Sequence, residues 1–277
     1  DRKELLTFEE IERVARAFVA HGVETLRITG GEPLVRRQIE NLIEKLAALD
    51  GVTDLSVTTN GALLTRRRAE QLRDAGLDRV TVSLDSLDDA LFKTINDVEF
   101  PVARVLEGID NAANVGLGPV KINMVVKRGV NEHEIVPMAE HFRGSGHILR
   151  FIEYMDVGTT NGWRLDDVYP ARDIAADIDA VSDIEPIAPN YAGEVAKRWR
   201  YVGDDSEIGI ISSVSQPFCS ACSRARLSAE GQIYTCLFAN RGTDFRQLLR
   251  DGVDDEGLAR AVESMWEVRD DRYSEIR

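Results

Sequence analysis

The stretch Leu26-Arg27-Ile28-Thr29-Gly30-Gly31-Glu32-Pro33-Leu34 decides how this chain folds. The β-branched residues 23–29 predict a strand, and the amphipathic residues 37–49 predict a helix. Two glycines directly after a strand let a ligand approach the backbone closely, and a carboxylate beside them can accept hydrogen bonds from an ammonium group. The stretch therefore predicts a strand, a ligand-binding loop and a helix, in that order.

The same order recurs along the first half of the chain. Thr7 and Glu10 form a capping box for a helix predicted at residues 7–20. Further strands are predicted at residues 54–59, 79–84, 120–126 and 148–155, and further helices at residues 66–75, 102–113 and 132–142. Alternating strands and helices form a parallel sheet that binds ligands at the carboxyl ends of its strands. The fold class is α/β, and periodicity leaves an open sheet and a barrel as alternatives.

Polar side chains follow two more of the predicted strands, at Thr58-Thr59-Asn60-Gly61 and at Ser83-Leu84-Asp85-Ser86. Hydroxyls and amides at successive strand ends suit a polar small molecule, although the same residue types also cap helices. Lys121, Arg150 and Met155 are weaker candidates, because such a cation is ordinarily a surface charge and a methionine ordinarily packs in a core. Recurrence at three strand ends favours a binding site.

The pattern changes after Met155. Residues 157–169 lack periodicity and predict a loop, and two hairpins are predicted at residues 197–214 and 226–237. Two helices, near residues 244–249 and 256–268, complete the chain. We therefore predict two domains, residues 1–156 and residues 157–277.

Composition limits the kind of protein. The 277 residues carry 34 basic and 48 acidic side chains, a formal net charge of −14, which argues against broad binding to nucleic acid. With 43% hydrophobic and 30% charged residues the chain has enough apolar material for a core, and no apolar run is long enough to span a membrane. The chain starts at Asp1 inside a helical pattern, and we expect further segments beyond both printed ends.

All three cysteines, Cys219, Cys222 and Cys236, lie in one short stretch. An odd number argues against a disulfide framework and for a reducing cytoplasm. Three thiolates suit a cuboidal iron–sulfur cluster that leaves one iron open, whereas a structural zinc site needs a fourth ligand and all four histidines lie upstream. Spacing alone leaves cluster and zinc as alternatives, and three packing cysteines as a third.

Arg224 and Arg226 lie beside the cysteines and share one face if the segment is extended. Guanidinium groups bind phosphates or a purine edge through paired hydrogen bonds. The ordinary alternative is a solvated strand face, but the adjacent thiols favour a pocket for an anionic nucleotide.

These residues together resemble the GTP 3′,8-cyclase (molybdenum cofactor biosynthesis protein A) family of radical S-adenosylmethionine (SAM) enzymes. The likeness covers nearly the whole chain, and its most specific segment runs from Pro217-Phe218-Cys219 through Arg224-Ala225-Arg226-Leu227 to Cys236. The resemblance implies a partial (β/α) barrel of the radical SAM type with a smaller C-terminal α+β domain. It also implies a cytoplasmic lyase, a homodimer, that converts GTP to (8S)-3′,8-cyclo-7,8-dihydroguanosine 5′-triphosphate and supplies a cyclic pyranopterin-forming enzyme.

The resemblance also assigns residues and cofactors. It implies two 4Fe-4S clusters in the intact protein, one of them held by Cys219, Cys222 and Cys236 and open to GTP. By position, the SAM contacts are Gly31, Ser83 and Met155. The GTP contacts are Arg27, Thr58, Lys121, Arg150, Arg224 and Arg226, of which the last two are also the implied catalytic residues.

The chain departs from the family pattern at three places. No cysteine precedes Cys219, so the family's N-terminal cluster loop lies outside the printed chain. The family's Gly-Gly C-terminal tail also lies outside it. Ser223 stands where the family commonly has asparagine. Two other functions remain as alternatives: a non-catalytic zinc- or cluster-binding nucleotide-sensing module, and a barrel lyase without metal.

Overall fold

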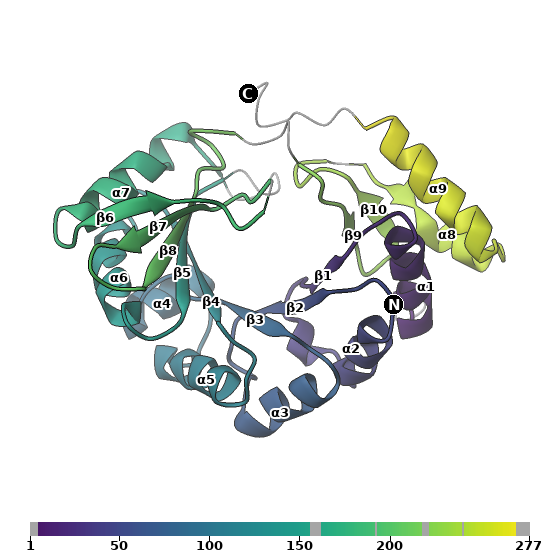
Figure 1. Ribbon diagram of the computed structural model, residues 1–277, viewed down its shortest axis with the longest axis horizontal. Helices are drawn as coiled ribbons and strands as arrows, with labels where there is room; N and C mark the ends of the chain where they lie inside the picture. The colour runs from purple at the N-terminus through teal and green to yellow at the C-terminus, as the bar shows by residue number, and fades with distance from the viewer. Residues whose placement is uncertain (1–4, 156–161, 192, 218–221, 240, 270–277) are drawn as a thin grey trace.

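The computed structural model describes residues 5–155, 162–191, 193–217, 222–239 and 241–269. Its main feature is a curved eight-stranded sheet with helices along its outer side (Figure 1). In spatial order the strands are β1 (Thr25–Ile28), β2 (Asp54–Thr59), β3 (Arg79–Ser83), β4 (Lys121–Val126), β5 (Ile148–Glu153), β8 (Glu207–Ile211), β7 (Lys197–Tyr201) and β6 (Ile184–Ile187). The first six are mutually parallel, and β7 and β6 run antiparallel to their neighbours.

Alternation along each strand separates a core from a concave polar face. On β2, for example, Leu55 and Val57 are fully buried against the helices, whereas Thr58 faces the other way. Burying one such apolar side chain contributes roughly 1.5–3 kcal/mol, so these residues fix which face of the strand turns toward the helices. The helices that cover them are α2 (Ile39–Ala47), α3 (Arg66–Asp74), α4 (Asp89–Asn96), α5 (Val102–Asn114), α6 (Ile135–Phe142) and α7 (Ala171–Asp179).

The predicted strands and helices of the first half are confirmed to within two residues at almost every end. The capping box of α1 (Phe8–Val19) is present, because Thr7 Oγ1 accepts from the Glu10 amide at 3.1 Å and Glu10 Oε2 accepts from the Thr7 amide at 2.8 Å. Helices α4 and α7 and strand β6 were not predicted. Only Phe92 of α4 is buried, and β6 contains Pro186, so neither element has a strong periodic signal.

The predicted hairpin at residues 197–214 is confirmed as β7 and β8, and it extends the main sheet because β8 lies parallel to β5. The predicted boundary between two domains, at residues 156 and 157, stays a prediction. The second hairpin forms a separate sheet of β9 (Arg226–Leu227), β10 (Gln232–Tyr234) and β11 (Thr243–Asp244).

This small sheet packs with the two last helices against the first one. Ile233 of β10, Phe245 of α8 (Phe245–Arg250) and Leu258 of α9 (Asp255–Glu267) share a second core with Val14 of α1. Figure 1 shows this group beside β1, whereas β6 and β7 lie at the opposite end of the arc. Among the described residues, none of the helices has the length and apolar character needed to cross a lipid bilayer.

Candidate active site

Strand register brings most of the predicted ligand-binding residues onto the concave face. Thr58, Thr81 and Lys121 stand side by side in one row across β2, β3 and β4. In the next row toward the carboxyl ends, Ser83 neighbours Asn123, and Asn123 neighbours Arg150. The alternate residues of the same strands are buried in the core, so these side chains point together into the curve of the sheet.

Three cations on this face perturb one another. Burial, together with neighbouring cations, lowers the pKa of Lys121 to about 8 and that of Arg150 to about 10, and burial is the larger cause for both. The Arg27 side chain on β1 is open to solvent, yet the surrounding protein and nearby cations also lower its pKa. Like charges gathered at an electrostatic cost are typical of a site that binds an anion.

Arg150 is held in place by its neighbours. Its Nε donates a hydrogen bond of 2.9 Å to Asn123 Oδ1. On the adjacent strand β8, a Cβ added to Gly209 would lie 3.0 Å from Arg150 Cγ and 3.2 Å from Ala196 Cβ. A glycine at this position therefore leaves room for the arginine side chain to lie across the sheet.

Arg79 and Asp54 belong to the same face and were not identified from the sequence. They begin adjacent strands, and Arg79 forms a two-bonded ion pair with the Asp54 carboxylate, with Nε to Oδ1 at 2.7 Å. Within the described residues, Arg79 Nη1 is buried without a hydrogen-bond partner. The alternation of β2 and β3 places both residues on the polar face, a signal that could have found them.

The paired glycines lie at the end of β1, as predicted. A Cβ built on Gly31 would meet no atom within 4 Å, so the backbone there is open to a ligand. The Glu32 carboxylate accepts hydrogen bonds from Thr59 Oγ1 and from the Asn60 amide, each at 2.7 Å. These bonds fix the glycine loop to the end of β2, and this internal role of Glu32 was not anticipated from the sequence.

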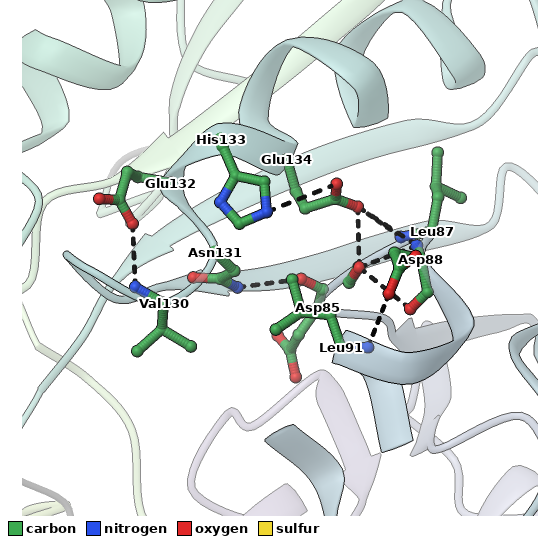
Figure 2. Close-up of polar contacts among 10 residues, drawn as sticks. Asp85, Leu87, Asp88, Leu91, Val130, Asn131, Glu132, His133 and Glu134 are labelled. Atoms are coloured by element: carbon green, nitrogen blue, oxygen red, sulfur yellow. Dashed lines mark hydrogen bonds and ion pairs between the residues drawn. The ribbon is translucent and has the colours of Figure 1, made fainter. Parts of the chain in front are cut away.

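A buried polar network holds the chain after β3 (Figure 2). Asp85 Oδ1 accepts from the Val125 amide at 2.8 Å, and the Asn131 side chain donates to the Asp85 carbonyl at 2.9 Å. Burial raises the pKa of Asp85 to about 6, although the bond from Val125 partly offsets it. Glu134 accepts from the Ser86 hydroxyl at 2.8 Å. The network fixes the segment directly after Ser83, a predicted SAM contact.

The described part of the thiol segment contains Cys222 and Cys236, whereas Cys219 lies outside the described residues. Arg224 Nε and Nη2 both lie 3.3 Å from Cys222 Sγ. Burial opposes ionisation of Cys222, but hydrogen bonds from the Arg224 backbone and guanidinium outweigh it and lower the pKa of the thiol. A thiol that ionises readily suits metal ligation.

Arg226 and Arg269 complete this region. Burial lowers the pKa of Arg226, as do Arg224 and Arg269 nearby, while the two described thiols act in the opposite direction. Arg269 also helps to lower the pKa of Cys222, and its Nη2 donates to the Thr235 carbonyl at 2.9 Å. Arg269 was not predicted from the sequence, because it lies 33 residues beyond Cys236 and after a helix.

The described residues contain no group of three histidine, cysteine, aspartate or glutamate side chains that could hold a metal ion, and the third predicted thiol is not among them. The two thiols that are described lie beside cations and outside any disulfide, which fits the donor set of an iron–sulfur cluster.

Comparison with known proteins identifies the family. The Radical SAM superfamily model matches residues 1–142, and the Molybdenum Cofactor Synthesis C model matches residues 147–275. The GTP 3′,8-cyclase of Acidothermus cellulolyticus is 51% identical over 280 residues, covering 100% of this chain and 77% of that protein. The chain belongs to the GTP 3′,8-cyclase family. Other similar members are those of Xanthomonas campestris pv. campestris, at 49% identity, and Staphylococcus aureus, at 46%; each comparison covers 100% of this chain and 81% of the relative.

Solved structures support the fold of this cyclase family member. Streptococcus suis SuiB has a TM-score of 0.63 at 16% identity, over 92% of this chain and 62% of SuiB, and its SAM-bound form has a TM-score of 0.62. The resemblance and the partial-barrel α/β fold expected from the sequence are confirmed. The individual SAM, GTP and cluster contacts of this cyclase stay predictions.

Proposed function

We propose that this chain is the radical SAM enzyme GTP 3′,8-cyclase, a lyase. It converts GTP to (8S)-3′,8-cyclo-7,8-dihydroguanosine 5′-triphosphate, the first step of molybdenum cofactor biosynthesis. The observation that carries this conclusion is 51% identity along the entire chain to a protein of that name. The concave cationic face supports it independently, because a nucleoside triphosphate is a multivalent anion.

In this proposal the strand cations bind the phosphates of GTP. Lys121 and Arg150 occupy neighbouring rows of the sheet, and Arg27 lies across the curve on β1. Thr58, in the same row as Lys121, offers a hydroxyl for a ribose or phosphate oxygen. Arginine forks bind phosphate through two parallel hydrogen bonds, and Lys121 adds a compact charge.

SAM would lie at the carboxyl ends of the strands, against Gly31, Ser83 and Met155. The open space at Gly31 fits a ligand that approaches the backbone, and Ser83 ends β3 on the concave face. Cys219, Cys222 and Cys236 would hold the GTP-side 4Fe-4S cluster. When bound, SAM and the cluster that reduces it would supply the abstraction of a hydrogen atom from the ribose of GTP.

The protein's own residues bind, orient and shield the substrate. Arg224 and Arg226 are the proposed catalytic pair: they lie beside the thiols and can donate hydrogen bonds to the guanine base while its ring is attacked. The strand cations fix the other end of the nucleotide. Holding both ends places the ribose carbon next to the guanine carbon with which it must bond, and a closed site excludes water from reactive intermediates.

The test is an anaerobic assay of the intact, iron-reconstituted protein with SAM, a reductant and GTP. We expect GTP-dependent formation of 5′-deoxyadenosine together with the cyclised nucleotide. Tight GTP binding without either product, in protein with a full complement of iron, would instead support a nucleotide-sensing module. Colourless protein with stoichiometric zinc would contradict the cluster assignment.

Several finer features are part of the proposal. We propose two 4Fe-4S clusters in the intact protein, a homodimer, a cytoplasmic location and delivery of the product to a cyclic pyranopterin-forming enzyme. The odd number of cysteines argues against a disulfide framework and supports a reducing compartment. The 277-residue polypeptide, reconstituted alone with iron and sulfide, should bind no more than one cluster; about eight irons per chain would contradict this.

A further inference from the structure

Glu153, the last residue of β5, is a buried carboxylate that the proposed chemistry does not use. None of its surface is exposed to solvent. It shares one face of β5 with the core residues Leu149 and Phe151, so it points to the outer side of the sheet and away from the cations. A buried carboxylate is costly unless hydrogen-bond donors surround it, and its donors therefore show what it holds together.

Four hydrogen bonds reach this carboxylate from two distant segments. Oε1 accepts from the amide of Ala171, the first residue of α7, at 2.7 Å, and from the Ser215 hydroxyl. Oε2 accepts from the amides of Val214 and Ser215, each at 2.8 Å. The Glu153 carbonyl accepts from the Ser213 hydroxyl at 3.3 Å. Residues 213–215 are thus fastened to the end of β5 by both the side chain and the backbone of one residue.

The fastened segments lead to the two halves of the proposed site. Met155, a proposed SAM contact, follows Glu153 by two residues. Cys219, a proposed cluster ligand, follows Ser215 by four residues. Four residues span at most about 14 Å when fully extended. An anchor at Ser215 therefore restricts where the thiol loop, residues 219–236, can begin.

We propose that Glu153 is a positioning residue that aligns the thiol loop with the SAM end of β5. This inference rests on the proposed function, because alignment matters only if SAM and GTP must meet. Radical transfer needs the reacting atoms in contact, and a displacement of about 1 Å can lower a rate about 100-fold. Loosening residues 213–215 should therefore misplace GTP while leaving SAM bound.

Glu134 provides a matched control (Figure 2). Like Glu153, it is a buried carboxylate, with 8% of its surface exposed, and it accepts from a serine hydroxyl, Ser86, and from the Leu87 amide, both at 2.8 Å. The hydrogen bonds printed for its carboxylate come from the segment after β3, its other neighbour is His133 at 4.0 Å, and none of these partners belongs to residues 213–215. Glu134→Gln should therefore destabilise the fold without loosening the thiol loop.

The decisive variant is Glu153→Gln, in which an amide NH₂ must face donors that need an acceptor. In the intact, anaerobically reconstituted protein we expect the ratio of 5′-deoxyadenosine to cyclised product to rise at least about threefold, and the dissociation constant of GTP to rise about tenfold. The dissociation constant of SAM should change less than about twofold. Glu134→Gln, whose hydrogen bonds hold the segment next to Ser83 on the SAM side, should leave the dissociation constant of GTP at the wild-type value.

Two further measurements keep the test decisive. Ser215→Ala removes one hydroxyl donor and should shift the ratio in the same direction by less, which decides the question if Glu153→Gln does not fold. Hydrogen exchange at the Val214 and Ser215 amides should accelerate in Glu153→Gln and not in Glu134→Gln. An unchanged ratio and unchanged GTP affinity, with only a lower melting temperature, would show that Glu153 is merely structural. If wild-type protein forms neither product, the proposed function fails, whereas exchange rates and GTP and SAM affinities still decide the role of Glu153.

Discussion

The strand cations and the thiol loop lie on different kinds of backbone. Lys121 and Arg150 belong to strands hydrogen-bonded on both sides, so the sheet sets their positions before any ligand arrives. Cys222 and Cys236 lie outside regular strands, next to β9 and β10, which have two and three residues. The thiol loop therefore depends on side-chain hydrogen bonds, such as those of Arg224, and we expect its ligands to order it further.

This difference separates binding from reaction. A preformed row of cations gives affinity for a triphosphate, because little ordering entropy is lost when the anion binds. The thiol loop, in the proposed function, orients the reacting base. Damage to the loop should therefore lower turnover as well as GTP affinity, whereas damage to the strands should weaken GTP binding and change turnover much less.

The largest expected effect comes from the loop. Arg226→Ala should lower the rate of cyclised-product formation by about 100-fold or more, because a charged donor beside the reacting base is lost. SAM affinity should not change, and Arg226→Lys should restore only part of the rate, because an ammonium lacks the guanidinium fork. Turnover numbers and SAM binding by equilibrium titration measure both. If SAM binding fell as much as turnover, the thiol loop would not act on the reaction separately from cofactor binding, and the comparison with the strand cations would fail.

On the strands, Lys121→Ala should raise the KM for GTP by about 10- to 100-fold, with kcat changed much less, because a charge-assisted hydrogen bond contributes about 1.5–3 kcal/mol. Steady-state kinetics under anaerobic conditions test this prediction. A fall in kcat at unchanged KM would place Lys121 with the loop residues instead.

GTP affinity should also depend on pH through Lys121. Its pKa in the free protein is lowered to about 8, so the lysine is charged below that pH and increasingly neutral above it. A bound phosphate needs the charged form, so affinity should fall by up to about tenfold for each pH unit above about 8. Lys121→Arg keeps its charge and should flatten this profile. A profile as steep as that of the wild type would assign the titration to another group.

The smallest effect is expected from Gly209→Ala. Its Cβ would lie 3.0 Å from Arg150 Cγ, so the arginine side chain must shift by a few tenths of an ångström. We expect a KM for GTP about two- to fivefold higher and a stability loss of about 1 kcal/mol. Gly203→Ala, in the turn after β7, is a control in which a Cβ meets no atom within 4 Å but the φ of +90° is strained. That variant should lower stability without changing KM.

Much of the fold was predictable because its signals are local. The alternation of β2 and the helical spacing of α3 can be read within ten residues, and both elements were located correctly. The arrangement of the second half was less predictable: β8 joins the main sheet beside β5, although 53 residues lie between the end of β5 and the start of β8. The local sequence of neither strand specifies which strand it pairs with.

The sequence by itself determined the alternation of strands and helices in the first half, the polar strand ends and the thiol spacing, because each follows from repeats or motifs within a short window. Only the tertiary structure showed that Glu153 fastens residues 213–215, that Arg79 pairs with Asp54, and that Arg269 approaches Cys222. These contacts join segments between 25 and about 60 residues apart. Such pairings depend on the path of the whole chain, and local preference of the residues involved cannot choose among the many partners that a buried charge would accept.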